Sequence, residues 1–229
     1  MFIISKLKEW SYWFTKLHRA YDYNISHQLL IKATQEAIEF YHNSMPNAII
    51  LYKHDKKTIL DFELRRISTN GLYLEFGTYK AVWTNYIADK ITPITIHGFD
   101  SFEGIPEPFH EVDVGFGTLH GILPKVRKNV ILHKGLFSET IPKFAESNKE
   151  KIAYLNIDSD SYSSTKTIFD NLGDRLQDGT IIHFGEYLNR PRWKEYEHKA
   201  FTEFMNGQDY TFDYLAVDPV GRVSIKIEK

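Results

Sequence analysis

The sequence contains no cysteine. Without thiol groups the chain cannot form disulfides, thiolate zinc sites or a cysteine nucleophile, so any nucleophile or metal ligand must be an oxygen or a histidine nitrogen. A chain without cysteine also suits a reducing compartment, and we predict that the protein is cytoplasmic.

The chain has no excess of positive charge either, with 28 Lys and Arg residues against 30 Asp and Glu residues and a formal net charge of -2. Proteins that bind nucleic acid usually carry a basic surface that neutralises phosphates. The one local basic group, Lys125, Arg127, Lys128 and Lys134, is more typical of a solvated face. We therefore expect no nucleic-acid partner.

Long hydrophobic runs are also missing. The opening Met1-Phe2-Ile3-Ile4 becomes charged at Lys6 and Lys8, which is too short for a signal peptide or a membrane span, so we expect no stable membrane insertion. The aromatic segment from Trp10 to Leu17 could lie on a membrane surface, but such faces more often pack on their own domain or on a second subunit. We therefore interpret residues 1–69 as an N-terminal helical, lid or dimerisation extension, which allows a homodimer.

What is present is a regular alternation of short apolar runs and longer segments. After the turn signal Asn70-Gly71, residues 72–77 predict a buried strand that ends in glycine, and residues 81–90 predict a helix. Further strands are predicted at 94–99, 130–133, 152–157 and 180–184. Each gap between them is long enough for a crossover connection, so the pattern predicts an α/β fold with a mostly parallel sheet flanked by helices.

The two ends of the chain depart from this alternation. Residues 26–41 have helical spacing, and residues 49–52 form a short apolar run. Residues 210–227 predict two strands joined by a turn at Asp218-Pro219-Val220-Gly221, which indicates a C-terminal antiparallel hairpin. A mostly parallel sheet that ends in such a hairpin is typical of the Rossmann-like class I methyltransferase fold, and we assign this domain to residues 70–229.

Small and acidic residues follow the first two strands of this domain. Gly77, after Glu75, would let the backbone approach a ligand, although the full GxGxxG spacing of a dinucleotide site is missing. Asp100 and Ser101 follow the second strand, a little over twenty positions later. An acid at that place can accept both hydroxyls of a ribose, or it can cap a helix. Together the two strand ends favour a nucleoside ligand.

The two later parallel strands deliver titratable side chains to the same edge of the sheet. Asp158 and Asp160 follow one strand, and His183 and Glu186 lie at the end of the next. Carboxylates and an imidazole at one edge suit proton abstraction or a hard metal ion. The structural alternative is that one of the aspartates caps a helix that begins near Ser163, while Glu186 pairs with Arg190 or Arg192.

Four stretches, taken in order, resemble the macrocin O-methyltransferase family. They are Gly98-Phe99-Asp100-Ser101-Phe102-Glu103-Gly104-Ile105-Pro106-Glu107, Gly135-Leu136-Phe137-Ser138-Glu139-Thr140-Ile141-Pro142, Asp158-Ser159-Asp160-Ser161-Tyr162-Ser163-Ser164-Thr165, and Gly179-Thr180-Ile181-Ile182-His183-Phe184-Gly185-Glu186-Tyr187. The last is continued by Trp193, Glu197, Lys199, Ala200 and Phe201. The similarity covers roughly residues 70 to 227.

The resemblance implies a class I fold, S-adenosylmethionine as methyl donor, and a hydroxyl on a sugar of a natural product or glycan as acceptor. It also implies residue roles. The methionine end of the cofactor would lie on Glu75, Gly77 and Thr78, and its ribose on Asp100 and Ser101. Asp158 would lie nearest the reacting centre, also against the cofactor, and the catalytic candidates are Asp158, His183 and Glu186.

The resemblance further implies a magnesium ion held by an Asp after the fourth strand and an acidic pair after the fifth. In this chain the pair falls on positions 185 and 186, and the first of them is Gly185. Asp158 and Glu186 could still hold Mg2+, or the metal is absent and a side chain acts directly as base. A third reading is a catalytically degenerate protein that still binds S-adenosylmethionine.

The segment from Pro106 to Leu123 is long for a connection and contains Phe109, His110, Phe116 and several glycines. It is interpreted as a substrate lid, with an ordinary surface loop as the alternative. A nucleotide-sugar dehydrogenase or epimerase is a further rival, but the missing GxGxxG spacing and the C-terminal hairpin argue against it.

Overall fold

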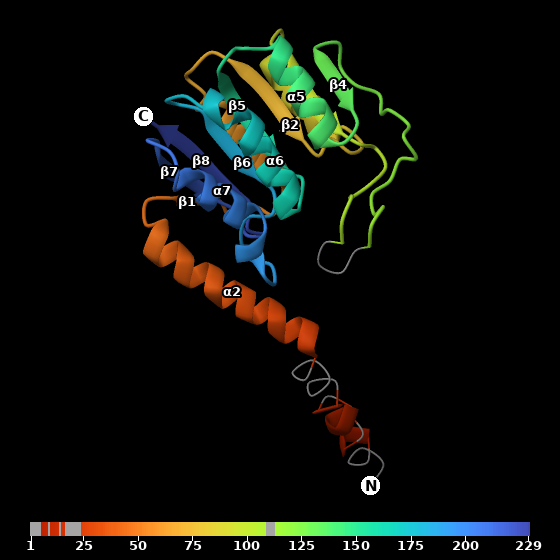
Figure 1. Ribbon diagram of the computed structural model, residues 1–229. Helices are drawn as coiled ribbons and strands as arrows, with labels where there is room; N and C mark the ends of the chain where they lie inside the picture. Colours follow the sequence, from red (N-terminus) through yellow and green to blue (C-terminus); the bar gives the residue numbers. More distant parts are fainter. Residues whose placement is uncertain (1–5, 9, 14, 17–23, 109–112) are drawn as a thin grey trace.

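The computed structural model describes residues 6–8, 10–13, 15–16, 24–108 and 113–229. These residues form one eight-stranded sheet in the order β1-β7-β8-β6-β5-β2-β3-β4 (Figure 1). The strands are β1 (Ile49–Ile50), β2 (Leu72–Phe76), β3 (Ile96–Asp100), β4 (Val130–Lys134), β5 (Ile152–Ile157), β6 (Ile181–Phe184), β7 (Thr211–Val217) and β8 (Val223–Glu228).

Neighbouring strands pair in parallel throughout, except that β8 is antiparallel to both β6 and β7. The predicted α/β fold is therefore confirmed: a mostly parallel Rossmann-like sheet that ends in an antiparallel hairpin. Each strand predicted between residues 72 and 227 is present, with bounds that shift by one or two residues.

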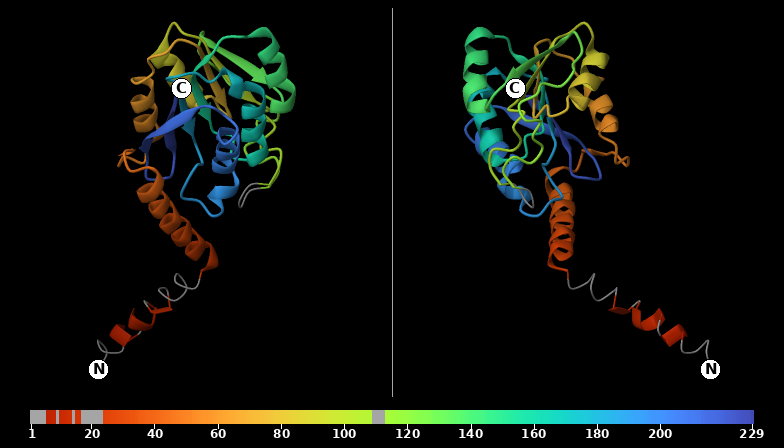
Figure 2. Two further views of the ribbon diagram at one scale, coloured as in Figure 1. Left: turned by 60° about the vertical axis from the view of Figure 1, so that its left-hand side comes forward. Right: turned by 90° about the vertical axis from the view of Figure 1, so that its right-hand side faces the viewer.

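Helices cover both faces of the sheet. They are α2 (Ile25–Ser44), α3 (Lys56–Leu64), α4 (Val82–Ile91), α5 (Phe137–Ser147), α6 (Tyr162–Leu172) and α7 (Glu197–Met205), with short 3-10 helices at Gly173–Arg175 and Trp193–Glu195. The helices α5, α6 and α7 lie on one face, and α3 and α4 lie on the other (Figure 2).

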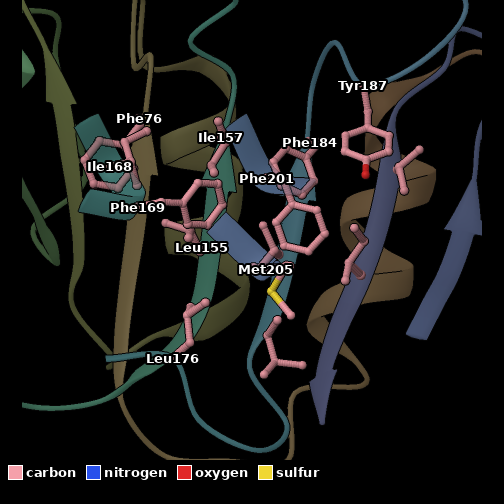
Figure 3. Packing of buried hydrophobic residues seen from close by; sticks show 14 of the residues in the cluster. Phe76, Leu155, Ile157, Ile168, Phe169, Leu176, Phe184, Tyr187, Phe201 and Met205 are labelled. Atoms are coloured by element: carbon pink, nitrogen blue, oxygen red, sulfur yellow. The ribbon is translucent and has the colours of Figure 1, made fainter. Parts of the chain in front are cut away.

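Side chains that alternate along the strands build a separate core on each face. On the α5 to α7 side, Leu155, Ile157 and Phe184 pack with Phe169 of α6 and Phe201 of α7 (Figure 3). A smaller core on the other face consists of Leu60, Tyr73, Ile87, Ala88, Ile96, Val130, Ala153, Tyr154 and Ile181. The sheet is thus held between two apolar layers, which fixes the strand ends that carry the site.

One described segment, residues 25–44, extends away from this body. Helix α2 projects from it (Figure 1), and it buries only Ala33 and Ala37, while Leu29, Leu30 and Ile38 stay exposed. No helix in the described residues is both long enough and apolar enough to cross a membrane. The aromatic segment is described only in part, because Phe14 and Leu17 lie outside the described residues.

Part of the predicted extension joins the domain. Strand β1 pairs with β7 at the edge of the sheet, and α3 packs onto one face through Ile59 and Leu60. The division of the chain after residue 69 remains a prediction, but residues 49–64 contribute directly to the sheet and to the site described below.

The order of the strands decides where a ligand can bind. From β2 the chain runs outward through β3 and β4, and it then returns to form β5 on the other side of β2. Loops at the carboxyl ends of β2 and β5 therefore lead in opposite directions and leave a crevice between them. Of the residues singled out in the sequence, Gly77 follows β2, Asp100 ends β3, and Asp158 and Asp160 follow β5.

Candidate active site

A pocket of about 500 Å³ opens at the carboxyl ends of β2, β3 and β5. Its wall includes Gly77 after β2, Asp100 and Ser101 at the end of β3, and Asp158 and Asp160 after β5. The structure thus brings together five positions that span much of the sequence. A concave site with a few convergent polar groups is the usual form of a small-molecule site.

Gly77 allows two loops to meet at the pocket floor. Its backbone has φ +92°, and a Cβ atom at this position would overlap the carbonyl oxygen of Asp158 and lie 2.8 Å from the carbonyl carbon. Only glycine combines this backbone conformation with so close an approach. The neighbouring Thr78 is buried, and its backbone lies against Phe99 of β3.

The Asp100 carboxylate is fixed by two backbone groups. It accepts hydrogen bonds from the N–H of Tyr79 at 2.7 Å and from the N–H of Phe102 at 2.6 Å. Burial raises the pKa of Asp100 above its ordinary value. Ser101 accepts from the N–H of Glu103 and donates to the carbonyl of Gly104. No helix follows β3 in residues 101–108, so Asp100 orders a turn and does not cap a helix.

Glu75 lies beneath the pocket and does not line it. Its carboxylate accepts hydrogen bonds from Thr84 of α4 and, at 2.9 Å, from the side-chain amide of Asn156 of β5. The side chain is fully buried, and this burial raises its pKa to about 7. Glu75 therefore supports the strand ends from below.

Asp158 carries the most unexpected contact of the site. Its Oδ2 atom lies 2.6 Å from the Nζ atom of Lys56, which comes from α3. Burial works to raise the pKa of the Asp158 carboxyl, but the positive charge and the hydrogen bond of Lys56 outweigh this effect and hold the pKa below its usual value. Asp158 is therefore an ionised, oriented carboxylate at the pocket wall.

Asp160 has no hydrogen-bond or ion-pair partner within the described part of the chain. It lines the pocket from a left-handed backbone position with φ +65°. Burial and the negative charge of nearby Asp158 raise the pKa of Asp160 to about 7. The expectation that one of these aspartates caps the following helix is wrong, because the N-cap of α6 is Ser161, whose Oγ accepts from the N–H of Ser164.

His183 and Glu186 lie away from the pocket wall. His183 on β6 is fully buried, with Nδ1 2.8 Å from the Oε1 atom of Glu63. Glu186 forms an ion pair with Arg190, which is the structural alternative considered for it. Of the three catalytic candidates, the structure brings only Asp158 to the pocket.

Helix α3 supplies two residues that the sequence analysis did not single out. Lys56 and Glu63 are buried on the same face as Ile59 and Leu60, at spacings that repeat with the helical period. The helix begins at N-cap Asp55, whose carboxylate accepts from the N–H of Thr58. That cap and the apolar pair could have predicted the helix, but nothing local shows that its charged residues face inward.

The side chains at this edge do not fit a divalent metal. Among the described residues no group of three or more His, Asp or Glu side chains is placed to hold one. Asp158 is bound by Lys56 and Glu186 by Arg190. A Cβ atom at Gly185 would overlap Oδ1 of Asp158 and lie 3.0 Å from its Cγ, so an acid at this position would displace the Asp158 carboxylate from the place where Lys56 holds it.

The segment between β3 and β4 forms one side of the pocket. Ile105, Pro106, Phe116 and Gly117 line it, and Glu107 of the same segment accepts a hydrogen bond from Ser163 of α6 at 2.6 Å. Residues 101–108 and 113–129 contain no helix or strand. Phe109 and His110, which belong to the predicted lid, lie outside the described residues, and the lid remains a prediction.

The sequence and the fold are similar to those of known methyltransferases. The profile of a family described as "Methyltransferase domain" matches residues 74–187, which contain the end of β2, the strands β3 to β6 and all residues that line the pocket. No curated protein sequence matches this chain.

Solved structures share the fold at low sequence identity. The calicheamicin methyltransferase CalS11 is 19% identical, with a TM-score of 0.57 over 89% of this chain and 93% of that chain. The O-methyltransferase NovP is 18% identical, with a TM-score of 0.57 over 75% and 80%. An O-methyltransferase from Bacillus cereus, solved in complex with SAH, is 14% identical, with a TM-score of 0.50 over 92% and 94%. The chain therefore has the Rossmann-like methyltransferase fold.

Proposed function

We propose that this chain, whose methyltransferase fold carries a pocket at the carboxyl ends of β2, β3 and β5, is an S-adenosylmethionine-dependent O-methyltransferase. The single observation that carries the proposal is the convergence of Asp100 with the pair Asp158 and Asp160 on one pocket of about 500 Å³. One acid would bind a ribose and the other two would serve the reacting groups.

The cofactor would lie across the crevice between β2 and β5. Asp100 would accept the ribose hydroxyls, because its two backbone hydrogen bonds already hold the carboxylate in one orientation. Ser101 lies beside it, and Gly77 lets the methionine part pass close to the backbone. Thr78 and Glu75 would support this end from behind the wall. The complex of the Bacillus cereus structure with SAH supports the same choice of cofactor.

Methyl transfer asks the protein mainly to position two reactants. The acceptor oxygen forms a bond to the methyl carbon, the carbon–sulfur bond breaks, and its electron pair goes to sulfur. The proton of the acceptor hydroxyl is transferred to a carboxylate of the pocket wall. We assign this proton to Asp160, whose carboxylate has no hydrogen-bond partner among the described residues. We assign orientation of the acceptor to Asp158, whose carboxylate is held by Lys56. His183 and Glu186 do not line the pocket, so they would assist catalysis only through the residues at its wall.

We propose a hydroxyl of a sugar or a sugar-bearing small molecule as acceptor. The pocket wall combines hydroxyl groups with apolar side chains: Ser138, Ser163, Ser164, Thr167, Phe116, Leu136 and Phe137. Such a wall can hydrogen-bond the hydroxyls of a sugar and pack on its apolar faces. The resemblance to the macrocin family supports this class. A second, apo structure of CalS11, named as a TDP-rhamnose 3'-O-methyltransferase, supports it too, at 21% identity and a TM-score of 0.52.

The alternative is a degenerate protein that binds S-adenosylmethionine without turnover. Gly185 favours it, because this position would carry an acidic ligand in the family that the chain resembles. The two functions share the cofactor site and differ only in catalysis.

Calorimetric titration with S-adenosylmethionine tests the cofactor first. We expect micromolar binding that Asp100→Ala weakens by about tenfold or more, since hydrogen bonds to a charged group are lost. Asp209→Ala, which removes an exposed carboxylate in the turn before β7, is the matched control and should bind as the wild type does. Absence of binding to the wild type would contradict both functions.

A second measurement separates the two functions. The protein is incubated with S-adenosylmethionine and a panel of nucleotide sugars and glycosides, and the mass gain of one methyl group is followed. Methylation that Asp160→Asn removes, with cofactor binding unchanged, supports the enzyme. Cofactor binding without methylation of any hydroxylated acceptor supports the degenerate alternative.

A further inference from the structure

Lys56 is a buried cation at the edge of the pocket. Its side chain is only 3% exposed, whereas its partner Asp158 is 29% exposed and lines the pocket. A lysine ammonium is rarely buried unless a carboxylate or another strong acceptor compensates for its lost hydration. The Nζ atom of Lys56 therefore lies behind Asp158, on the side away from a bound ligand.

A second buried polar contact fixes the helix that carries this lysine. Glu63, about two turns further along α3, accepts a hydrogen bond from the Tyr154 hydroxyl at 2.8 Å and contacts His183 at 2.8 Å. Tyr154 lies on β5 and His183 on β6, and all three side chains are buried. These contacts set the position of α3 on the sheet, and thereby the position of Nζ relative to Asp158.

The space beside Asp158 suits the contact between its carboxylate and Lys56, and it does not suit a second acid. Gly185 leaves room for the Asp158 carboxylate, because a Cβ atom there would overlap Oδ1. The next acid along the chain, Glu186, is already bound by Arg190. At the three positions where the resemblance implies metal ligands, 158, 185 and 186, the acid is thus either replaced by glycine or neutralised by a basic side chain, and of the aspartates at the wall after β5 only Asp160 keeps an unpaired carboxylate among the described residues.

We propose that the Nζ atom of Lys56 takes the place of a divalent cation at this site, so that the reaction proceeds without a metal ion. The inference rests on the proposed function. Lys56 is a positioning residue, which acts through Asp158: one ammonium group balances one carboxylate and holds it toward the pocket. Asp160 is then left as the proton acceptor, and no step needs a metal-bound oxygen.

Manganese provides a probe that needs no acceptor, because Mn2+ prefers oxygen ligands and its electron paramagnetic resonance signal is lost on binding. Metal-free protein is mixed with Mn2+ in the presence and absence of S-adenosylmethionine. We expect the free Mn2+ signal of the wild type to remain unchanged at millimolar metal. A loss of signal that Asp158→Asn abolishes would overturn the proposal.

Reversal of the charge at position 56 provides a second test, in which metal binding should be gained. Lys56→Glu places a carboxylate where the ammonium was, next to Asp158, and we expect it to bind Mn2+ about tenfold or more tightly than the wild type. Lys57→Glu, on the exposed side of the same helix, is the matched control and should not gain this binding. A folded Lys56→Glu protein that binds no more Mn2+ than the control would contradict the assigned cation position.

Cofactor titration keeps this result separate from the proposed function. Wild-type protein that binds both S-adenosylmethionine and Mn2+ at Asp158 would leave the methyltransferase proposal intact and remove only the role of Lys56. If Lys56→Glu does not fold, as shown by the loss of its thermal transition, the wild-type titration alone decides: Mn2+ binding overturns the inference, and its absence supports it.

Discussion

At the scale of single residues, the site depends on carboxylates whose surroundings differ sharply. Asp158 is held ionised by Lys56, Asp160 has a pKa of about 7, and Glu75 is fully buried with a pKa also raised to about 7. Three acids at one sheet edge thus have three environments. The difference arises from burial and from one buried ammonium group.

Glu75 gives a prediction about stability and pH. Its pKa rises from an ordinary value of 4.5 to about 7 in the folded chain. The folded state therefore binds the Glu75 proton more tightly than the unfolded state does, and this difference stabilises the fold by on the order of 3 kcal/mol. The stabilisation is fully present below about pH 4.5 and is lost as the pH rises to about 7. The side chain of the Glu75→Gln variant cannot ionise. We therefore expect the free energy of unfolding of the variant to rise relative to that of the wild type as the pH is raised from 5 to 8.

Denaturant titration of both proteins at several pH values measures this difference. Glu146→Gln, at an exposed carboxylate of α5, serves as control and should leave the difference from the wild type constant across these pH values. A constant difference between Glu75→Gln and the wild type across this range would show that Glu75 ionises normally in the fold.

Gly185 gives a second prediction at this scale. In Gly185→Ala the new Cβ would overlap Oδ1 of Asp158, so the carboxylate must rotate away from Lys56. We expect a loss of about 1–3 kcal/mol in the free energy of unfolding, as for other overpacked sites. Gly207→Ala, where the nearest atom would be 3.8 Å away, should change stability little, and equal effects of the two substitutions would contradict the proposed crowding at Asp158.

At the scale of elements, α6 links the sheet to the pocket. Its first two turns contribute Ser163, Ser164 and Thr167 to the wall, and its other side packs Ile168 and Phe169 into the core. The helix start is ordered by Ser161, whose side chain caps the backbone N–H of Ser164.

We predict that Ser161→Ala lowers the free energy of unfolding by about 1 kcal/mol, because the N–H of Ser164 loses its acceptor. Cofactor affinity should fall as well if the loosened turn forms part of the cofactor site. Thermal or urea unfolding measures the first effect and calorimetry the second. Ser147→Ala, near the end of α5, is the control: its hydroxyl bonds the carbonyl of Lys143 within the helix and caps no free N–H, so stability should stay close to that of the wild type.

At the scale of the whole molecule, the pocket joins segments that lie far apart along the chain. It draws on the ends of β2, β3 and β5, on α6 and on the segment between β3 and β4. A ligand that contacts all of them binds only the folded state, so binding should stabilise the molecule as a unit.

We therefore expect S-adenosylmethionine at about 100 times its Kd to add about 2.7 kcal/mol to the free energy of unfolding. For a chain of this size the gain corresponds to a rise in Tm of about 5–10 °C. A thermal shift assay measures it, with NADH as the comparison ligand. A rise with NADH and none with S-adenosylmethionine would favour the dehydrogenase reading instead. The homodimer remains a prediction, to be checked by the mass of the protein in solution.

The sequence by itself determined the strands, their parallel alternation and the closing hairpin. Apolar periodicity and turn residues are local signals, and they specify which segments are buried and where they end. The same signals placed Gly77, Asp100, Asp158 and Asp160 at strand ends, and parallel strands bring their carboxyl ends to one edge.

Only the tertiary structure decided the partners of these residues. Lys56 lies 102 positions before Asp158, and Glu63 lies 120 positions before His183. No local pattern encodes such contacts, because they depend on how α3 packs across the sheet. The sequence also could not show that His183 is enclosed or that Gly185 leaves room for Asp158. Both follow from the close packing of side chains and backbone, which exists only once the strands have paired.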